Sequence, residues 1–221
     1  RITYVQTALE NLPQTVEEET GRKLAILCAD APILWQQAHT LYQRAAVRLE
    51  DIRSESGMMV LDTAEEPLSP ELLLSFHEVL KQGTEQAASD PIFAPGVFKA
   101  LPNEVGGLVT TLPEEVPGQL ASLIERYEGG SRAFEDIVDF HYRFERIHPF
   151  QDGNGRIGRM VLFKECLRNG VLPFIVPDDK KRFYYRGLAN YEDEPGWLLD
   201  TCRAFQDDFA ARFLPLVPHL A

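Results

Sequence analysis

The chain is organised around one segment of twelve residues, His148-Pro149-Phe150-Gln151-Asp152-Gly153-Asn154-Gly155-Arg156-Ile157-Gly158-Arg159. It contains an imidazole, a carboxylate, glycines on both sides of an amide, and arginines three positions apart. One amphipathic helical pattern leads into the segment and another leads out of it. The sequence therefore predicts a loop between two helices, and this loop concentrates more chemistry than any other part of the chain.

The backbone of this loop is suited to binding an anion. Proline disfavours helical geometry in the residue before it, so the helix over residues 133–147 is expected to end at His148. Residues 152–155 can adopt positive φ, and such a turn aims several amide N–H groups at one point. The turn leads directly into the N-terminus of the next helix, which itself attracts anions.

The charged side chains sharpen this prediction. Arg156 and Arg159 are expected in the first turn of the second helix, where a cation costs roughly 0.3–1 kcal/mol. A bound polyphosphate would explain their position. A carboxylate beside phosphates, here Asp152, is the ligand that Mg²⁺ requires. The imidazole of His148 is suited to remove a proton from an incoming hydroxyl.

Each of these residues also has a simpler interpretation. Asp152 or Asn154 could only cap the helix, and the glycines could only form a tight turn. The arginines could pair with carboxylates of this acidic protein, and His148 could be structural. So dense a combination favours a ligand-binding site.

The rest of the chain predicts a mainly α fold. Apolar residues recur at helical spacing over residues 69–83, 116–127, 133–147, 157–168, 177–188 and 195–213. Two short, glycine-rich, β-prone runs over residues 96–100 and 105–110 predict one hairpin. We expect an N-terminal helical extension over residues 1–66, a catalytic core over 67–215 and a C-terminal tail over 216–221.

Composition limits the classes of function. The chain has 221 residues and a net charge of −12, which argues against a general nucleic-acid binder and makes any basic site local. Cys28, Cys166 and Cys202 are widely spaced, so neither a disulfide framework nor a zinc site is indicated, and a reducing, cytoplasmic setting is expected. No apolar run approaches the roughly 20 residues that span a membrane. We see no signal-peptide pattern, but the chain begins with Arg1, so what precedes it is unknown.

The central segment resembles the signature of the Fic (Fido) family, H-P-F-x-[D/E]-G-N-G-R-x-x-R, at every specified position. The resemblance extends over roughly residues 70–215. It implies a Fic-type helical bundle with a β-hairpin flap beside the active-site loop. It also implies a protein adenylyltransferase, which moves AMP from ATP to a Tyr, Thr or Ser hydroxyl of a target protein, with self-modification possible.

The resemblance assigns roles to the residues of the segment. His148 would be the general base, Asp152 would hold Mg²⁺ between the α- and β-phosphates, and Phe150 would anchor the loop in the core. The phosphates of ATP would be bound by the backbone amides and arginines that follow, namely Gly153, Asn154, Gly155, Arg156 (β-phosphate) and Arg159 (γ-phosphate).

Residues outside the segment receive roles in the same way. The flap would recruit an extended target segment by strand addition. It is formed by Val105, Gly106, Gly107 and Leu108. Tyr184 and Tyr185 fall where the family often places an aromatic side chain beside the adenine, and we assign this role to Tyr185.

Gly155 bears on the choice among activities. The family's phosphotransferase branch carries a bulkier basic residue there, so the glycine favours AMP transfer. Removal of AMP from a modified protein, transfer of phosphate or phosphocholine, and a non-catalytic nucleotide-binding module remain alternatives.

The inhibitory motif of many family members, [S/T]-x-x-x-E-[G/N], has no complete copy in this chain. Residues 51–56 lie near its usual position, which makes Glu55 a candidate to pair with Arg159. Otherwise, the control element could be degenerate, truncated or on a separate antitoxin chain. An antitoxin and a second copy of this chain are the expected candidate partners besides the target protein.

Overall fold

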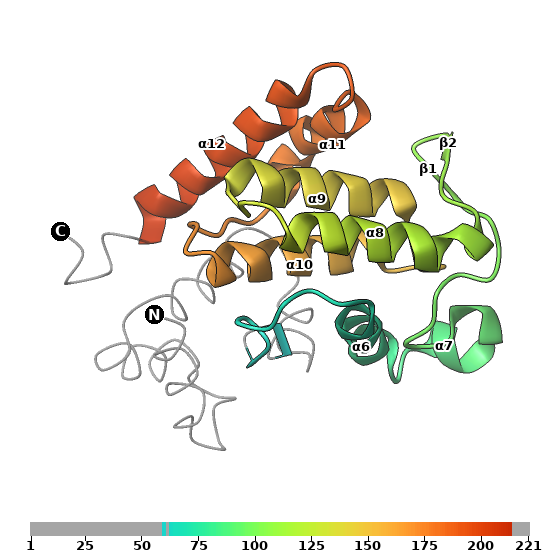
Figure 1. Ribbon diagram of the computed structural model, residues 1–221. Helices are drawn as coiled ribbons and strands as arrows, with labels where there is room; N and C mark the ends of the chain where they lie inside the picture. Colours follow the sequence, from blue (N-terminus) through green and yellow to red (C-terminus); the bar gives the residue numbers. More distant parts are fainter. Residues whose placement is uncertain (1–58, 61, 214–221) are drawn as a thin grey trace.

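The computed structural model describes residues 59–60 and 62–213, and it is mainly helical (Figure 1). Glu55 and most of the predicted N-terminal extension lie outside the described residues. The α-helices within them are α6 (Pro70–Lys81), α7 (Glu85–Ser89), α8 (Val116–Glu128), α9 (Phe134–Ile147), α10 (Asn154–Arg168), α11 (Lys181–Ala189) and α12 (Pro195–Phe213). Short 3-10 turns occupy Pro91–Phe93, Pro113–Glu115 and Asp178–Lys180. The prediction of a mainly α fold is confirmed.

Local signals determine where α6 begins. The Ser69 side chain accepts a hydrogen bond of 3.1 Å from the Leu72 N–H, and Pro70 occupies the first turn, where a missing N–H costs nothing. The buried face of α6 includes Leu73 and Phe76, which pack into the main core. The last turn of α6 therefore lies beside the loop that precedes α10.

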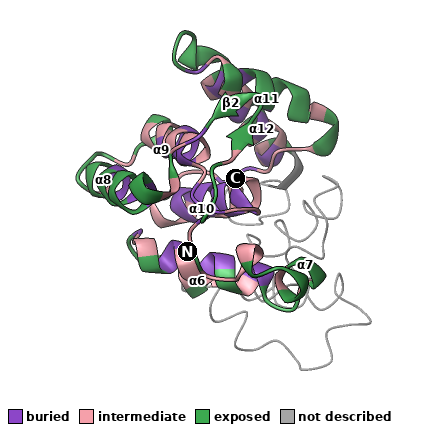
Figure 2. Cartoon of the chain, turned by 90° about the vertical axis from the view of Figure 1, so that its right-hand side faces the viewer, coloured by how far each residue is buried: buried purple, intermediate pink, exposed green. Residues whose placement is uncertain are grey.

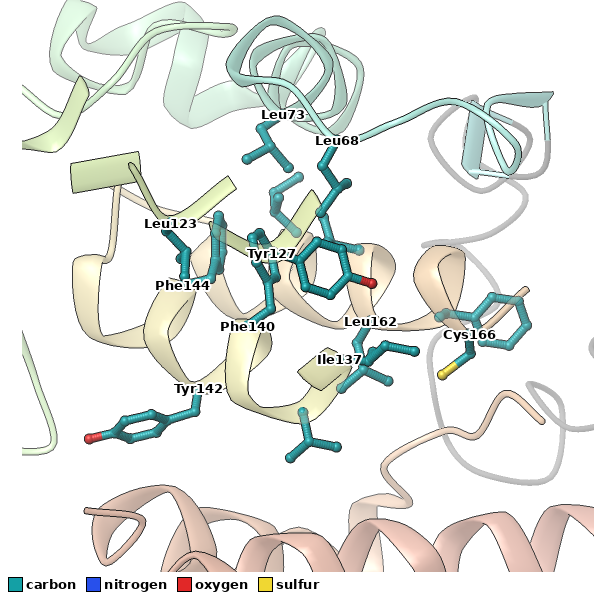
Figure 3. Close-up of a cluster of buried hydrophobic side chains, with 14 of the residues drawn as sticks. Leu68, Leu73, Leu123, Tyr127, Ile137, Phe140, Tyr142, Phe144, Leu162 and Cys166 are labelled. Atoms are coloured by element: carbon teal, nitrogen blue, oxygen red, sulfur yellow. The ribbon is translucent and has the colours of Figure 1, made fainter. Parts of the chain in front are cut away.

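Helix α10 lies at the centre of the molecule, packed against α9 and α6 (Figures 1 and 2). The sequence predicts one apolar stripe on this helix, but residues 161–166 are all buried. Two of them, Lys164 and Glu165, form an ion pair of 2.8 Å, and the Tyr127 hydroxyl donates to the Glu165 carboxylate at 2.8 Å. A buried charge pair that is also hydrogen-bonded can be tolerated in a core. Leu162 and Cys166 of the same helix belong to the cluster of buried hydrophobic side chains drawn in Figure 3.

The last two helices approach each other closely at a glycine. A Cβ added to Gly187 of α11 would lie 2.7 Å from the Cα of Leu198 in α12. Only glycine fits this contact without a shift of the backbone. The contact holds α11 against α12, and it places Tyr184 of α11 in the core.

The hairpin exists, but its strands differ from those predicted. Strands β1 (Glu104–Val105) and β2 (Leu108–Val109) pair antiparallel, and Gly106 and Gly107 form the turn with φ of 59° and 78°. A two-residue turn with positive φ at both positions requires its strands on either side of it. Residues 96–100 are therefore not the first strand, which corrects the sequence-based prediction.

Across residues 59–60 and 62–213, no helix combines the length and apolar character needed to cross a membrane. The two described cysteines, Cys166 and Cys202, are free thiols, and both are buried.

Candidate active site

His148 ends helix α9, as the sequence predicts. It has φ 52° and ψ 60°, and its N–H donates to the Phe144 carbonyl at 2.9 Å. The left-handed region is uncommon for a residue other than glycine, and such backbone strain clusters at functional sites. The chain turns sharply here, between the end of α9 and the loop that leads into α10.

The hydrogen bonding of His148 indicates which ring nitrogen carries the proton. Its Nδ1 lies 3.2 Å from the Glu145 carbonyl oxygen, which can only accept, so Nδ1 donates. Burial lowers the pKa of His148 below its ordinary value, and the nearby Lys99 cation lowers it further, against the opposing effects of the Glu145 carbonyl and Asp152. The imidazole is therefore neutral near neutral pH, and Nε2 has a lone pair that can accept a proton.

The side chain of Asn154 closes the loop. Its Oδ1 accepts from the Phe150 N–H at 2.8 Å, and its Nδ2 donates to the Phe150 carbonyl at 2.7 Å. Phe150 is fully buried and stacks on the ring of His77 with centroids 4.1 Å apart. Asn154 thus positions the loop through its side chain, whereas the sequence assigns a ligand-binding role only to its backbone N–H.

The amide groups of the loop are arranged as an anion site requires. Gly153 is the N-cap of α10 with φ 84°, and its carbonyl accepts from the N–H groups of Arg156 and Ile157. Asn154 and Gly155 occupy the first turn, where backbone N–H groups have no carbonyl of the helix to bond to. Of residues 152–155, only Gly153 has positive φ.

The two arginines lie in different turns and have different neighbours. Arg156 is in the first turn, and its Nη2 lies 3.4 Å from Oδ2 of Asp152. Arg159 lies in the second turn, which corrects the prediction that both share the first. A Cβ on Gly155 would lie 3.2 Å from Nη1 of Arg159, so a side chain at position 155 would crowd this guanidinium.

Asp152 has a second cationic partner that sequence analysis did not identify. Nζ of Lys81, at the end of α6, lies 2.8 Å from Oδ2 of Asp152 and also bonds Oε1 of Gln86 at 2.6 Å. Burial raises the pKa of Asp152, but the Lys81 hydrogen bond and the nearby cations outweigh it and hold the pKa below its ordinary value. The carboxylate is ionised near neutral pH. Lys81 follows Leu73 and His77 at intervals of four on the buried face of α6, and this spacing could have revealed it.

A second buried lysine joins the base of the hairpin to the site. Nζ of Lys99 donates to Asn103 Oδ1 at 2.7 Å, Thr110 Oγ1 at 2.6 Å and the Ile147 carbonyl at 3.3 Å. The backbone N–H of Lys99 donates to the Pro149 carbonyl at 2.9 Å. Burial lowers the pKa of Lys99 to about 8. Lys99 thus holds the hairpin beside His148, a role for which the sequence offers no local signal.

The hairpin is exposed, with Val105 37%, Leu108 47% and Val109 64% accessible. Three apolar side chains at the surface of such a short sheet are unusual for a purely structural turn. The candidate site therefore has an exposed apolar strand pair next to the loop that precedes α10.

The two tyrosines of α11 lie in different environments. Tyr184 is buried, and its hydroxyl contacts Nε2 of His141 in the core. Tyr185 is 54% exposed, with its ring centroid 5.5 Å from that of Tyr184. Tyr184 therefore belongs to the core, and Tyr185 is the tyrosine of this pair available to a ligand.

A family model described as the Fic/DOC family matches residues 67–165, which include the whole segment from His148 to Arg159. Residues 67–165 are therefore similar in sequence to Fic/DOC domains. The expected Fic-type helical bundle with a small hairpin is confirmed.

Relatives of the domain include enzymes named protein adenylyltransferase Fic. The Drosophila virilis protein is 42% identical over 55 residues, which are 24% of this chain and 11% of that protein. The Caenorhabditis elegans protein adenylyltransferase fic-1 matches at the same identity and coverage. The chain thus matches only about a tenth of the length of these curated relatives.

Solved structures show the same fold. A Fic domain containing signaling protein from Bacteroides thetaiotaomicron is 27% identical, with a TM-score of 0.54, over 75% of this chain and 63% of that one. A Fic family protein from Desulfovibrio desulfuricans is 20% identical, with a TM-score of 0.55, over 96% of this chain and 72% of that one. At this level of identity the second match concerns the fold alone.

Proposed function

We propose that this Fic/DOC domain transfers AMP from ATP to a hydroxyl group of a target protein. The observation that carries the proposal is the hydrogen bond from His148 Nδ1 to the Glu145 carbonyl. It leaves Nε2 unprotonated on the residue that begins the loop into α10, so a base and a candidate anion site belong to the same loop. The names of the curated relatives support the choice of AMP as the group transferred.

In the proposed reaction, residues of this chain move the proton and stabilise the charge. His148 Nε2 removes the proton from the hydroxyl of a Ser, Thr or Tyr side chain as its oxygen forms a bond to the α-phosphorus of ATP. The bond between this phosphorus and the oxygen of the β-phosphate breaks, and pyrophosphate leaves. The N–H groups of Asn154 and Gly155, with Arg156 and Arg159, would stabilise the negative charge on the phosphates.

Mg²⁺ would be held by Asp152. An ionised carboxylate that is partly exposed (41%) fits this role, because Mg²⁺ in nucleotide sites commonly takes one or two carboxylates and completes its shell with phosphate oxygens and water. Within the described residues, no group of three or more Asp, Glu, His or Cys side chains forms a separate metal site. The ion would supply charge neutralisation between the phosphates.

The target and the adenine would bind on either side of this centre. An extended target segment would pair with the exposed hairpin around Val105 and Leu108, and Tyr185 would lie beside the adenine. Gly155 supports AMP transfer over transfer of the γ-phosphate, since it leaves room for the Arg159 guanidinium.

Incubation of a lysate with ATP labelled at the α-phosphate, and separately at the γ-phosphate, tests the proposal. We expect protein labelling from the α position only, and its loss in His148→Ala and Asp152→Asn. Labelling from the γ position alone would instead indicate a phosphotransferase. Release of AMP from a pre-modified target, with no incorporation of label, would indicate the reverse reaction.

A further inference from the structure

A cavity of about 540 Å³ opens between the hairpin, α8 and α9, apart from the segment of residues 148–159. Helices α8 and α9 lie side by side along it (Figure 1). Its lining includes Thr111, Arg126, Tyr142, Arg143, Arg146 and Glu192. We call this cavity the arginine groove.

The groove is basic, although the chain as a whole carries a net charge of −12. Three arginines line it, against one carboxylate, that of Glu192. Arg143 is paired, with its Nε 2.8 Å from Oδ2 of Asp139. Arg126 and Arg146 form no ion pair with any of the described residues. Two guanidinium groups therefore face one cavity, and neither has a counterion among residues 59–60 and 62–213.

Helix ends explain part of this arrangement. Arg126 and Arg146 each lie in the last turn of a helix, where a cation is favourable. That preference does not require both to line the same cavity. Burial raises the pKa of the Tyr142 hydroxyl, which donates to Glu192 at 3.1 Å, while Arg146 and Arg143 act against this rise. The lining thus also offers a hydroxyl and a carboxylate, which can bond the amides of a peptide backbone.

The position of the groove relates it to the active site. At one end it is lined by Val109, Thr110 and Thr111 of the hairpin, and by Ile147, which precedes His148. The lining of α8 extends from Gly118 to Arg126, a rise of about 12 Å, enough for roughly three or four extended residues. A chain that pairs with the hairpin and presents a hydroxyl to His148 could therefore continue into the groove.

We infer that the arginine groove binds an acidic segment of the target protein, whose carboxylates pair with Arg126 and Arg146. This inference rests on the proposed function, because it is the pairing of the target with the hairpin that brings its flanking residues to the groove. A nucleic acid is the less favoured polyanion, since the large negative charge of the chain would repel its phosphates beyond the groove. The domain should therefore prefer target segments in which acidic side chains flank the modified hydroxyl.

Binding of labelled peptides to the full chain tests the inference. The probes are fluorescein-labelled peptides with one central threonine and three glutamates scanned along either side, and matched peptides with glutamine. At about 50 mM NaCl, we expect the best glutamate peptide to bind about tenfold more tightly than its glutamine counterpart. The preference should shrink at about 0.5 M NaCl, because these pairs are partly exposed.

Variants decide whether the groove causes the preference. The double variant Arg126→Ala/Arg146→Ala should lose it, whereas Arg203→Ala, which removes an exposed arginine of α12 outside the groove, should keep it. Glu192→Gln keeps an acceptor for Tyr142 and removes a repulsive charge, so it should strengthen binding of the glutamate peptide. An unchanged preference in the double variant would overturn the inference, as would tighter, arginine-dependent binding of a single-stranded DNA of equal charge.

The outcome is separable from that of the proposed function, because peptide binding needs no ATP. Selective binding without transfer of labelled AMP would support the proposed role of the groove and contradict the proposed transferase activity. Equal transfer to glutamate and glutamine peptides, with equal binding of both, would support the transferase activity and contradict the role of the groove.

Discussion

Nζ of Lys81 lies 2.8 Å from Oδ2 of Asp152, although 71 residues separate them in the chain. The lysine side chain is 2% exposed and the aspartate side chain 41%. The end of α6 thus provides a fixed cation behind the carboxylate proposed to hold Mg²⁺. The pair ties α6 to the loop before α10, and its positive charge would compete with the proposed Mg²⁺ for Asp152.

Replacing this cation should both destabilise the domain and strengthen metal binding. In Lys81→Met, the free energy of unfolding should fall by about 1–2 kcal/mol, a modest loss because Asp152 is partly solvated. Mg²⁺ should then raise the melting temperature more than in the wild type, because the carboxylate has one cation fewer beside it. Thermal unfolding with and without Mg²⁺ measures both effects.

Gln86→Leu is the matched control for this prediction. It removes the other hydrogen-bond partner of Lys81 but leaves the ion pair with Asp152 in place. It should change the response to Mg²⁺ little. An equal response in Lys81→Met and the wild type would show that the lysine does not affect the metal site.

Glu145 should make the stability of the domain depend on pH. Its side chain is 12% exposed, and its Oε1 has no hydrogen-bond partner. Burial raises its pKa to about 7, although Arg159 acts in the opposite direction. Because the folded-state pKa lies above the unfolded value, stability is highest when the carboxyl is protonated and declines as pH rises towards the folded pKa.

Between about pH 5 and about pH 8, the wild type should therefore lose about 2–3 kcal/mol relative to Glu145→Gln. Urea unfolding at both pH values gives the difference. Glu125→Gln, an exposed position on α8, should show no such trend. Parallel pH dependence of Glu145→Gln and the wild type would exclude Glu145 as the titrating group.

The elements that sequence analysis located correctly have local causes. Ser69 caps α6 and Pro149 stops α9 through contacts within a few residues, so their signals can be read directly. The segment from His148 to Arg159 is likewise contiguous, and its order predicts a loop between two helices.

The features that sequence analysis missed depend on contacts between distant residues. Lys81 and Lys99 are buried because Asp152 and Ile147, which follow far along the chain, accept their hydrogen bonds. The first strand of the hairpin is predicted wrongly, because residues 96–100 resemble a strand in composition. The backbone of this segment instead bonds the loop before α10, through the N–H of Lys99. Strand propensity alone cannot distinguish a strand from an extended segment of this kind.

The contact between α9 and α10 depends on Gly158. A Cβ at this position would lie 2.5 Å from Oε1 of Glu145 and 3.0 Å from Cε1 of His141. Although alanine is the better helix former, Gly158→Ala should destabilise the domain by about 1–3 kcal/mol through overpacking. Gly196→Ala in α12 meets no atom within 4 Å and should be neutral or stabilising. Denaturant unfolding of the two variants measures the contrast, and equal stabilities would contradict it.

Lys99 couples the hairpin to the protonation of His148. Lys99→Met removes the hydrogen bonds to Asn103, Thr110 and the Ile147 carbonyl, at a cost of about 1–3 kcal/mol, and should speed amide exchange in the hairpin. It also removes a cation that lowers the pKa of His148, so this pKa should rise towards its ordinary value.

The direction of the pKa change separates this electrostatic effect from simple loosening of the loop. In the proposed reaction His148 must be neutral to act as a base, so a higher pKa should move the loss of the proposed AMP transfer in acid to higher pH. Lys99→Arg retains a cation and its N–H donors, and it should keep both the pKa of His148 and the pH profile near those of the wild type. The titration of the His148 ring by NMR gives the pKa directly. A pKa that rises equally in Lys99→Arg and Lys99→Met would assign the change to altered packing, because the charge is lost only in the methionine variant.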